Sequence, residues 1–158
     1  AVKVNSNYDK AYYSMGKTYI NLGNFNEAEA ALKNATTANP EYSKAYESLG
    51  YIYSSREEYN TAVDNYLLAI KYDSKGHDAY SRLASAYNAQ ELFSKARDAA
   101  KKSIDLKKKN AGAAYELGVA EKGLGNIAAA KSAFESATKD KKWRKIAKYE
   151  LTMIEKGL

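Results

Sequence analysis

The chain has 158 residues, of which 45% are apolar and 28% are charged, and its formal net charge at pH 7 is +6. This balance is typical of a folded globular domain and excludes a disordered tail. The absence of cysteine excludes disulfides, thiolate zinc sites and cysteine nucleophiles, and no run approaches the roughly 18 to 20 consecutive apolar residues that cross a bilayer.

Helix formers dominate the composition. A single proline stands against fifteen tyrosines, so the chain has almost no residue that breaks a helix and much aromatic bulk to pack. We therefore expect an all-α fold.

A period of 34 residues runs through the chain. Small residues share it at two positions of the unit: Gly16, Gly50, Ala84 and Gly118 at the first, and Ala28, Ala62, Ala96 and Ala130 at the second. Large residues recur beside them at four further positions: Tyr12, Tyr46 and Tyr80; Met15, Leu49, Leu83 and Leu117; Tyr19, Tyr53 and Tyr87; and Phe25, Tyr59, Phe93 and Ile127. A repeat of this length predicts a stack of similar units, none of which buries its apolar surface alone.

Each unit has the pattern of a helical hairpin. Between Tyr12 and Tyr19 the small and apolar residues recur at helical spacing, and those from Ala28 to Ala35 do the same, which places each set on one stripe of a helix. The segment Leu22-Gly23-Asn24 between them is a turn signal. We expect the glycine or alanine at each crossing to let the two helices approach closely.

This order of residues resembles the tetratricopeptide repeat, whose 34-residue unit carries an aromatic residue, Leu-Gly, Tyr, Ala, a second aromatic residue, Ala and a closing proline. Pro40 keeps the closing proline, whereas Ser74, Lys108 and Lys142 replace it. The resemblance implies a right-handed superhelical solenoid of four helical hairpins plus a C-terminal capping helix.

The predicted units follow from the period. We place repeats at 9–42, 43–76, 77–110 and 111–144 and a capping helix at 145–158, where Ala147, Leu151 and Ile154 restart the first-helix pattern. The fourth repeat departs most, with Ala114 and Glu121 at positions where the other repeats carry tyrosine.

The N-terminal segment 1–8 resembles the tail of a preceding repeat. We therefore expect the chain to be a fragment of a longer array, the alternative being a native start on a half-repeat. The outward face of the first hairpin would then lack its usual neighbour, which predicts self-association through residues near Val2, Val4 and Tyr8.

The sequence offers little for catalysis. His77 is the only histidine, and it stands after Gly76 at the start of a predicted helix, where a capping or exposed role is expected. The acidic pair Glu57-Glu58 lies in a predicted turn without a histidine or cysteine nearby, and no glycine-rich phosphate loop is present. We expect no enzymatic activity, no cofactor and no metal.

The resemblance implies that the first helices line a concave groove, which their residues outside the packed stripe would face. Exposed tyrosine beside hydroxyl, amide and lysine groups suits the binding of a peptide. The candidate groove residues are Lys10, Tyr13, Lys17, Ile20, Asn21, Lys44, Glu47, Tyr51, Ser54, Asp78, Ser81, Arg82, Ser85, Asn88, Tyr115, Val119 and Lys122.

Some members of the family hold the C-terminal carboxylates of a chaperone with lysine, asparagine and arginine side chains. At the corresponding places this chain has Tyr13 with Lys17, then Ser48, then Asp78 with Arg82. The amide donors are missing and Asp78 would repel a carboxylate by roughly 1 kcal/mol. We do not expect a chaperone clamp of this type.

The excess positive charge lies after residue 100, where 14 basic residues face 7 acidic ones. Several of these cations keep the repeat period and are expected to form a basic ridge, namely Lys75, Lys107, Lys108, Lys109, Lys141 and Lys142 with Arg144 and Lys145. Favourable interaction with helix C-termini is a sufficient reason for such placement.

We expect a scaffold or adaptor that binds an extended peptide or a partner helix in the groove. An assembly module that forms oligomers through repeat stacking is the alternative. Binding of an acidic partner or of nucleic acid through the basic ridge is a third hypothesis; nucleic acid is disfavoured because the ridge has little aromatic interleaving beyond Trp143.

Overall fold

The computed structural model describes residues 6–157, of which Ser6 and Asn7 are described by their backbone alone. Within this range the chain is helical and has no strand, as expected. The nine helices are α1 (Ser6–Asn21), α2 (Phe25–Ala38), α3 (Ser43–Ser55), α4 (Tyr59–Tyr72), α5 (His77–Ala89), α6 (Phe93–Leu106), α7 (Ala111–Gly123), α8 (Ile127–Ala137) and α9 (Arg144–Glu155).

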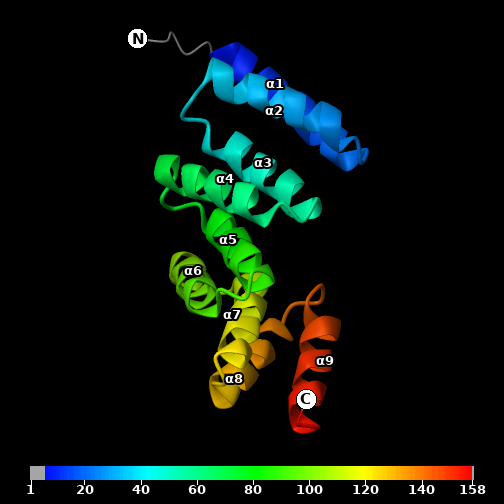
Figure 1. Cartoon of the computed structure of the whole chain (residues 1–158), viewed down its shortest axis with the longest axis vertical. Helices are drawn as coiled ribbons and strands as arrows, with labels where there is room; N and C mark the ends of the chain where they lie inside the picture. The colour runs from blue at the N-terminus through cyan, green and yellow to red at the C-terminus, as the bar shows by residue number, and fades with distance from the viewer. Residues whose placement is uncertain (1–5, 158) are drawn as a thin grey trace. The chain divides into compact units, whose positions relative to one another are not determined.

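The helices pair as hairpins within two compact units, Ala1–Lys75 and Gly76–Leu158. In the first unit α1 packs on α2 and α3 on α4; in the second α5 packs on α6, α7 on α8, and α9 on α8 (Figure 1). The four hairpins and the additional terminal helix confirm the predicted architecture.

Each hairpin crossing pairs a small residue with a side chain of complementary size. A Cβ placed on Gly50 would lie 2.5 Å from Cε1 of Tyr66, and one on Gly118 would lie 2.6 Å from Cδ1 of Phe134. These two glycines therefore make room for a large side chain of the partner helix. In the third hairpin Ala84 stands at the glycine position, and the partner position holds the small Ala100; both are fully buried.

The cores follow the predicted stripes. In residues 6–75, Leu32, Leu49 and Ile52 form the centre of a buried cluster, surrounded by half-buried tyrosines such as Tyr12 and Tyr53. In residues 76–157 a second cluster centres on Phe134, with Ala114 among its buried members. Ala114, at a position where the other repeats carry tyrosine, therefore belongs to the buried core of the fourth hairpin.

The turns inside the hairpins share one backbone conformation. Gly23 and Gly125 have φ of 78° and 77°, and the residues at the same repeat position in the other two hairpins, Glu57 and Glu91, have φ of 62° and 57°. Glycine adopts this left-handed region at little cost, whereas a glutamate there carries local strain. The turn geometry is therefore imposed by the hairpin and kept even without glycine.

The N-terminal boundary differs from the prediction. α1 begins at Ser6, so residues 6–8 belong to the first helix of the first hairpin and not to the tail of a preceding one. The predicted contributions of Val2 and Val4 lie outside the described residues. At the other end, α9 begins at Arg144, one residue before the predicted cap.

Candidate functional site

The first-helix face of residues 6–75 presents charge more than exposed aromatic surface. Lys10, Lys17 and Lys44 are exposed, but Tyr13 is half-buried, with its ring centroid 5.1 Å from that of Tyr42. Burial raises the pKa of the Tyr13 hydroxyl, which forms a hydrogen bond with Ser48. The expectation of a freely exposed Tyr13 is therefore wrong, because the ring packs against the start of the next hairpin.

Tyr51 is the exposed tyrosine among the predicted groove residues of this unit. Its side chain is 37% exposed, and its ring meets that of Phe25 edge-on at 6.4 Å. Asn21 is also exposed, whereas Ile20 packs on the core cluster. Two further predicted residues, Glu47 and Ser54, are half-buried, and the Ser54 hydroxyl lies 3.2 Å from that of Tyr66.

In residues 76–157 the structure brings four predicted groove residues to one open, polar pocket of about 350 Å³. Asp78, Ser81, Arg82 and Ser85 line it from α5. Its other lining residues are Asn110, Gly112 and Glu116 from α7 and its N-cap, and Lys142 and Trp143 from the segment before α9. Two cations, two carboxyl groups, hydroxyl groups and an indole thus surround one hollow.

Glu116, which the sequence analysis missed, is a buried carboxyl at this pocket. Asn88 donates from Nδ2 to both the backbone carbonyl of Glu116, at 2.9 Å, and its Oε2, at 2.8 Å. Burial raises the pKa of Glu116, with the hydrogen bonds from Asn88 and Ser85 acting in the opposite direction. The predicted groove residue Asn88 therefore serves first to hold this carboxyl.

The predicted groove residues of the fourth repeat are half-buried beside Trp143 and α9. Tyr115 has its ring centroid 5.3 Å from that of Trp143, and Val119 packs on the same cluster. Lys122 Nζ lies 3.3 Å from a carboxylate oxygen of Glu150 on α9. The expectation of an open surface at Tyr115, Val119 and Lys122 is wrong. Tyr115 and Val119 pack in one cluster with the apolar stripe of α9, and Lys122 pairs with Glu150.

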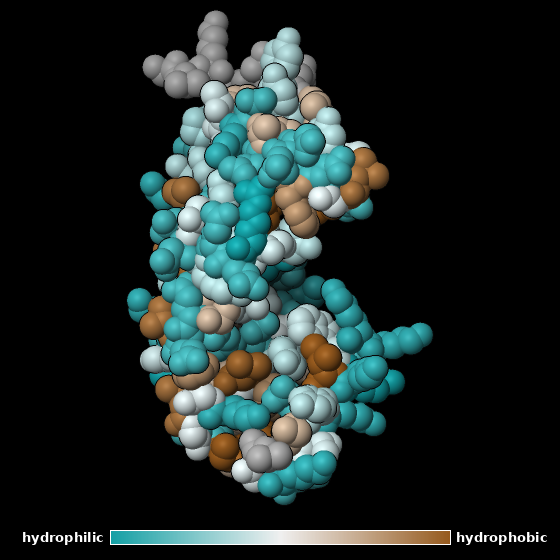
Figure 2. All heavy atoms as spheres, turned by 45° about the vertical axis from the view of Figure 1, so that its right-hand side comes forward, coloured by the Kyte–Doolittle hydropathy of each residue, from teal (hydrophilic) through white to brown (hydrophobic). Residues whose placement is uncertain are grey.

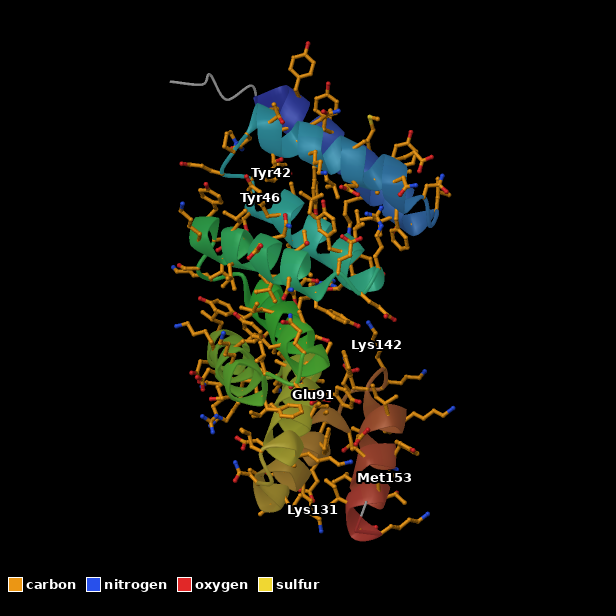
Figure 3. The ribbon with its side chains drawn as sticks, in the orientation of Figure 1. Tyr42, Tyr46, Glu91, Lys131, Lys142 and Met153 are labelled. Atoms are coloured by element: carbon orange, nitrogen blue, oxygen red, sulfur yellow. The ribbon has the colours of Figure 1, made fainter. Side chains whose placement is uncertain are left out.

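The opposite side of α9 carries exposed apolar residues that the sequence analysis also missed. Ile146 is 42% exposed and Tyr149 is 62% exposed. Lys142 extends beyond the N-terminal end of α9, and Met153 lies on the last turns of the same helix (Figure 3). Figure 2 shows hydrophobic side chains among hydrophilic ones on the second unit, with long hydrophilic side chains extending from it.

Part of the predicted basic ridge lines a second hollow of about 420 Å³ in residues 76–157. Lys108 and Lys109 reach it from the segment after α6, and Lys139 from the segment after α8, with Asp140 beside them. Lys108 Nζ also lies 3.5 Å from Asp105 Oδ1 in the last turn of α6, so one of these cations has an acidic neighbour.

His77 has a local structural environment. It begins α5, its Nδ1 lies 3.0 Å from Asp78, and its backbone carbonyl accepts a hydrogen bond from Ser103 Oγ at 2.7 Å. Across the described residues, no three histidine, cysteine, aspartate or glutamate side chains come together as metal ligands would. None of the helices described is both long enough and apolar enough to pass through a bilayer.

Comparison with known proteins places this geometry in context. The profile of the tetratricopeptide repeat protein 21 C-terminal ARM domain matches residues 1–102, and a tetratricopeptide repeat profile matches residues 111–139. A search of curated protein sequences gave no significant match.

Solved structures of similar fold cover most of the chain. A crystal structure of MamA is 30% identical over 94% of this chain and 85% of that one, with a TM-score of 0.77. The first tetratricopeptide domain of Spaghetti (RPAP3), bound to an HSP90 peptide, is 21% identical over 79% and 99%, with a TM-score of 0.76. YrrB, described as having an unusual peptide-binding site, is 18% identical over 89% and 72%, with a TM-score of 0.75.

The repeated hairpins define an all-α helical-repeat solenoid. The profile match over residues 1–102 and the 30% identity to MamA show that the chain belongs to the tetratricopeptide repeat family. Proteins of this family and fold are typically scaffolds without enzymatic activity.

Proposed function

We propose that the chain binds an extended polypeptide segment of another protein on its first-helix face. The observation that carries this proposal is the polar pocket of residues 76–157, where Ser81, Arg82 and Ser85 of α5 meet Trp143. Such a combination suits a peptide, because hydroxyl and guanidinium groups satisfy an extended backbone and the indole adds contact area. A helix of the partner protein could bind the same face in place of an extended segment, through its own polar side chains.

A displayed library of random peptides, selected on the full chain, tests this proposal. Selected peptides are synthesised and their affinities are measured by fluorescence anisotropy. Ser85→Trp fills the pocket with a bulky neutral side chain and should weaken binding about tenfold or more if the pocket is used. Ser94→Trp on α6 adds the same side chain at another exposed serine and should leave the affinity unchanged.

The outcome that would sink this proposal is equal binding by both variants, or selection of no peptide at all. Circular dichroism of each variant at the assay temperature ensures that a loss of affinity does not arise from unfolding.

Self-association is a second candidate function, favoured by one observation on α1. Tyr8, Met15 and Leu22 follow one another at intervals of seven and are 59%, 48% and 67% exposed. Leu49, at the position of Met15 in the second repeat, is only 3% exposed because it belongs to the core cluster with Leu32. An apolar strip on α1 is thus bare where its counterpart on α3 is covered.

Mass in solution tests this second candidate. If the strip forms an interface, the wild-type chain should associate as its concentration rises, and Met15→Ser with Leu22→Ser should remain monomeric. Leu67→Ser, at a residue of α4 that is 45% exposed, is the matched control and should behave as the wild type. A monomeric wild-type chain at high concentration would remove the candidate.

A further inference from the structure

α9 has two apolar strips, and only one of them is covered. Ala147 is fully buried, and Leu151 and Ile154 pack with it against Phe134. Ile146 and Tyr149 lie on the other strip and are 42% and 62% exposed. A capping helix that served only to end the array would be expected to present polar residues on all sides that it does not bury.

The repeat period identifies the face on which the exposed strip lies. Ile146, Tyr149 and Met153 follow Gly112, Tyr115 and Val119 of α7 by 34 residues, so they occupy the first-helix positions that we assigned to the groove. The exposed strip therefore continues the interaction face by one helix.

The hairpin side of α9 is polar by the same comparison. Lys148 and Thr152 occupy two of the positions at which first helices pack on their second helix, and both are exposed. A helix expecting such a partner would carry small or apolar residues there, as Gly118 does against Phe134. The polar residues thus cap the hairpin side, while the apolar ones are kept for the interaction face.

The surroundings of the strip are strongly basic. The ten residues from 139 to 148 contain six lysines or arginines and a single acidic residue, Asp140. Lys142 lines the pocket next to Trp143, with its Nζ 5.9 Å from the centre of the indole ring. Neither Lys142 nor Lys145 forms an ion pair with another described side chain. The charge of these two lysines is therefore not neutralised by another described side chain and can attract an acidic partner.

We propose that the exposed strip of α9 binds an acidic segment of a partner polypeptide, whose apolar side chains cover Ile146 and Tyr149 and whose carboxylates lie against Lys142 and Lys145. This inference rests on the proposed function and adds to it the chemistry of the partner. An aliphatic side chain beside a tyrosine provides contact area for apolar side chains, whereas the stacking of nucleic-acid bases needs a series of aromatic rings. The surface therefore fits a polypeptide better than a nucleic acid.

The displayed peptide library gives the test two independent readouts, the composition of the selected peptides and their dependence on α9. We expect enrichment of aspartate and glutamate next to leucine, isoleucine or phenylalanine. Ile146→Ser with Tyr149→Ser should weaken binding of these peptides about tenfold or more. Lys142→Gln with Lys145→Gln should weaken binding at low salt and flatten its dependence on ionic strength.

Matched controls lie on other exposed parts of the second unit. Leu92→Ser changes a residue that is 39% exposed, and Lys102→Gln with Lys107→Gln removes two exposed cations from α6 and its C-cap; these variants should bind as the wild type. Ile146 and Tyr149 are exposed, so their replacement should leave the fold intact, which circular dichroism checks. A single-stranded oligonucleotide and an acidic peptide without apolar residues serve as competitors.

The two proposals fail in different ways. Peptides that depend on Ser85 but are indifferent to the Ile146 and Tyr149 variants would overturn this inference and leave the proposed function standing. Selected peptides without acidic residues, or displacement by the oligonucleotide at the same site, would also overturn it. Selection of no peptide would overturn both.

Discussion

Neighbouring hairpins are joined by different chemistry in the two units. In residues 6–75 the junction between α2 and α3 is an ion-pair network centred on Glu29. Arg56 Nη1 donates to Glu29 Oε2 at 2.6 Å, Tyr53 Oη donates to Oε1 at 2.8 Å, and Lys33 Nζ lies 2.6 Å from the same carboxylate. The hydrogen bond with Lys33 leads the causes that lower the pKa of Glu29 to about 2.

In residues 76–157 two carboxyl groups, those of Glu116 and Glu121, lie on α7 and are buried. Glu121 stands at the repeat position of Tyr53 and is 6% exposed; it accepts a hydrogen bond from Asn126 Nδ2 at 2.8 Å. Lys101 Nζ of α6 lies 3.7 Å from it. Glu116 of the same helix accepts a hydrogen bond from Asn88 of α5, and burial raises the pKa of Glu116.

The comparison teaches that one repeat geometry accepts carboxyl groups in opposite electrostatic states. The Glu29 carboxylate has three donors and is stabilised in its charged form, whereas Glu116 is buried and its charged form is penalised by desolvation. The first unit should therefore lose stability in acid, and the second should lose stability as a buried carboxyl ionises.

The crossing pair of the fourth hairpin should give the largest effect. Phe134→Ala removes a fully buried ring and should cost about 3–5 kcal/mol, while Gly118→Ala should cost about 1–3 kcal/mol because its Cβ meets that ring. In the Phe134→Ala background, Gly118→Ala should become neutral or stabilising, since the pair then matches Ala84 and Ala100 of the third hairpin.

Urea unfolding followed by circular dichroism measures this cycle. The same cycle with Gly50→Ala and Tyr66→Ala asks whether the first unit follows the rule. Additive costs in either unit would show that size complementarity does not couple the two positions.

Removing the charge at the first junction should have the next largest effect. Glu29→Gln should destabilise the chain by about 1–2 kcal/mol at pH 7, a range that allows for partial exposure of the network. Because the folded pKa of Glu29 is lowered to about 2, its contribution is present above the ordinary carboxyl pKa near 4.5 and is lost as pH falls toward 2. Wild type and variant should converge in acid.

Thermal unfolding at a series of pH values measures this difference. Asp64→Asn, which neutralises an exposed carboxylate of α4, is the control and should change stability by less than about 0.5 kcal/mol. A difference between wild type and Glu29→Gln that stayed constant down to pH 2 would contradict the assignment.

Glu116→Gln should act in the opposite direction. Glutamine keeps an acceptor for Asn88 and removes a buried charge, so we expect a gain of about 1 kcal/mol at neutral pH, the usual scale of a single substitution. The folded pKa of Glu116 is raised, so the protonated carboxyl contributes stability below about pH 4.5 that is lost as pH rises through the folded pKa. The advantage of the variant should therefore grow as pH rises.

The measurement is the same series of thermal unfolding curves. A variant that is less stable than wild type at pH 7 would mean that the Glu116 carboxylate has a charged partner and that the contrast between the two units is wrong.

How far the sequence predicts this structure depends on whether a feature repeats. The small residues at positions 16, 50, 84 and 118 keep the period, so the sequence alone locates the hairpins and their crossings. Glu116 follows Ser14, Ser48 and Arg82 at its repeat position, and no pattern marks it as a buried carboxyl. Its burial depends on how α5 packs against α7. These helices belong to different repeats, so the pattern within one repeat does not show this packing.

The burial of Tyr115 against Trp143 has a similar reason. The period shows that Tyr115 and Tyr13 are equivalent, but it does not show which segment lies on each of them. Tyr13 meets Tyr42 and Tyr115 meets Trp143, so both rings pack on the segment that leads to the next helix. The sequence alone therefore predicted which face of the helix these rings occupy, and overestimated how exposed they are.

The turns within the hairpins should give the smallest effect and should not distinguish the two units. Glu57 in the first unit and Glu91 in the second both hold a positive φ, at the position where Gly23 and Gly125 stand in the other hairpins. A left-handed conformation costs a residue with a Cβ roughly 1–2 kcal/mol in the folded state, and glycine avoids this cost. Glycine also makes the unfolded chain more flexible, which lowers the free energy of unfolding by about 0.4–1 kcal/mol. Glu57→Gly and Glu91→Gly should therefore each stabilise the protein by about 0.5 kcal/mol.

Glu58 is the matched control, because it is adjacent to Glu57 and has an ordinary φ of −82°. Glu58→Gly should destabilise the chain, since glycine there adds only freedom to the unfolded state. Urea midpoints of the three variants, measured together, decide the matter. Stabilisation by Glu57→Gly without stabilisation by Glu91→Gly would show that the two units differ in their turns as well as in their junctions, because the backbone conformation at the two positions is the same and the relief of strain should be equal.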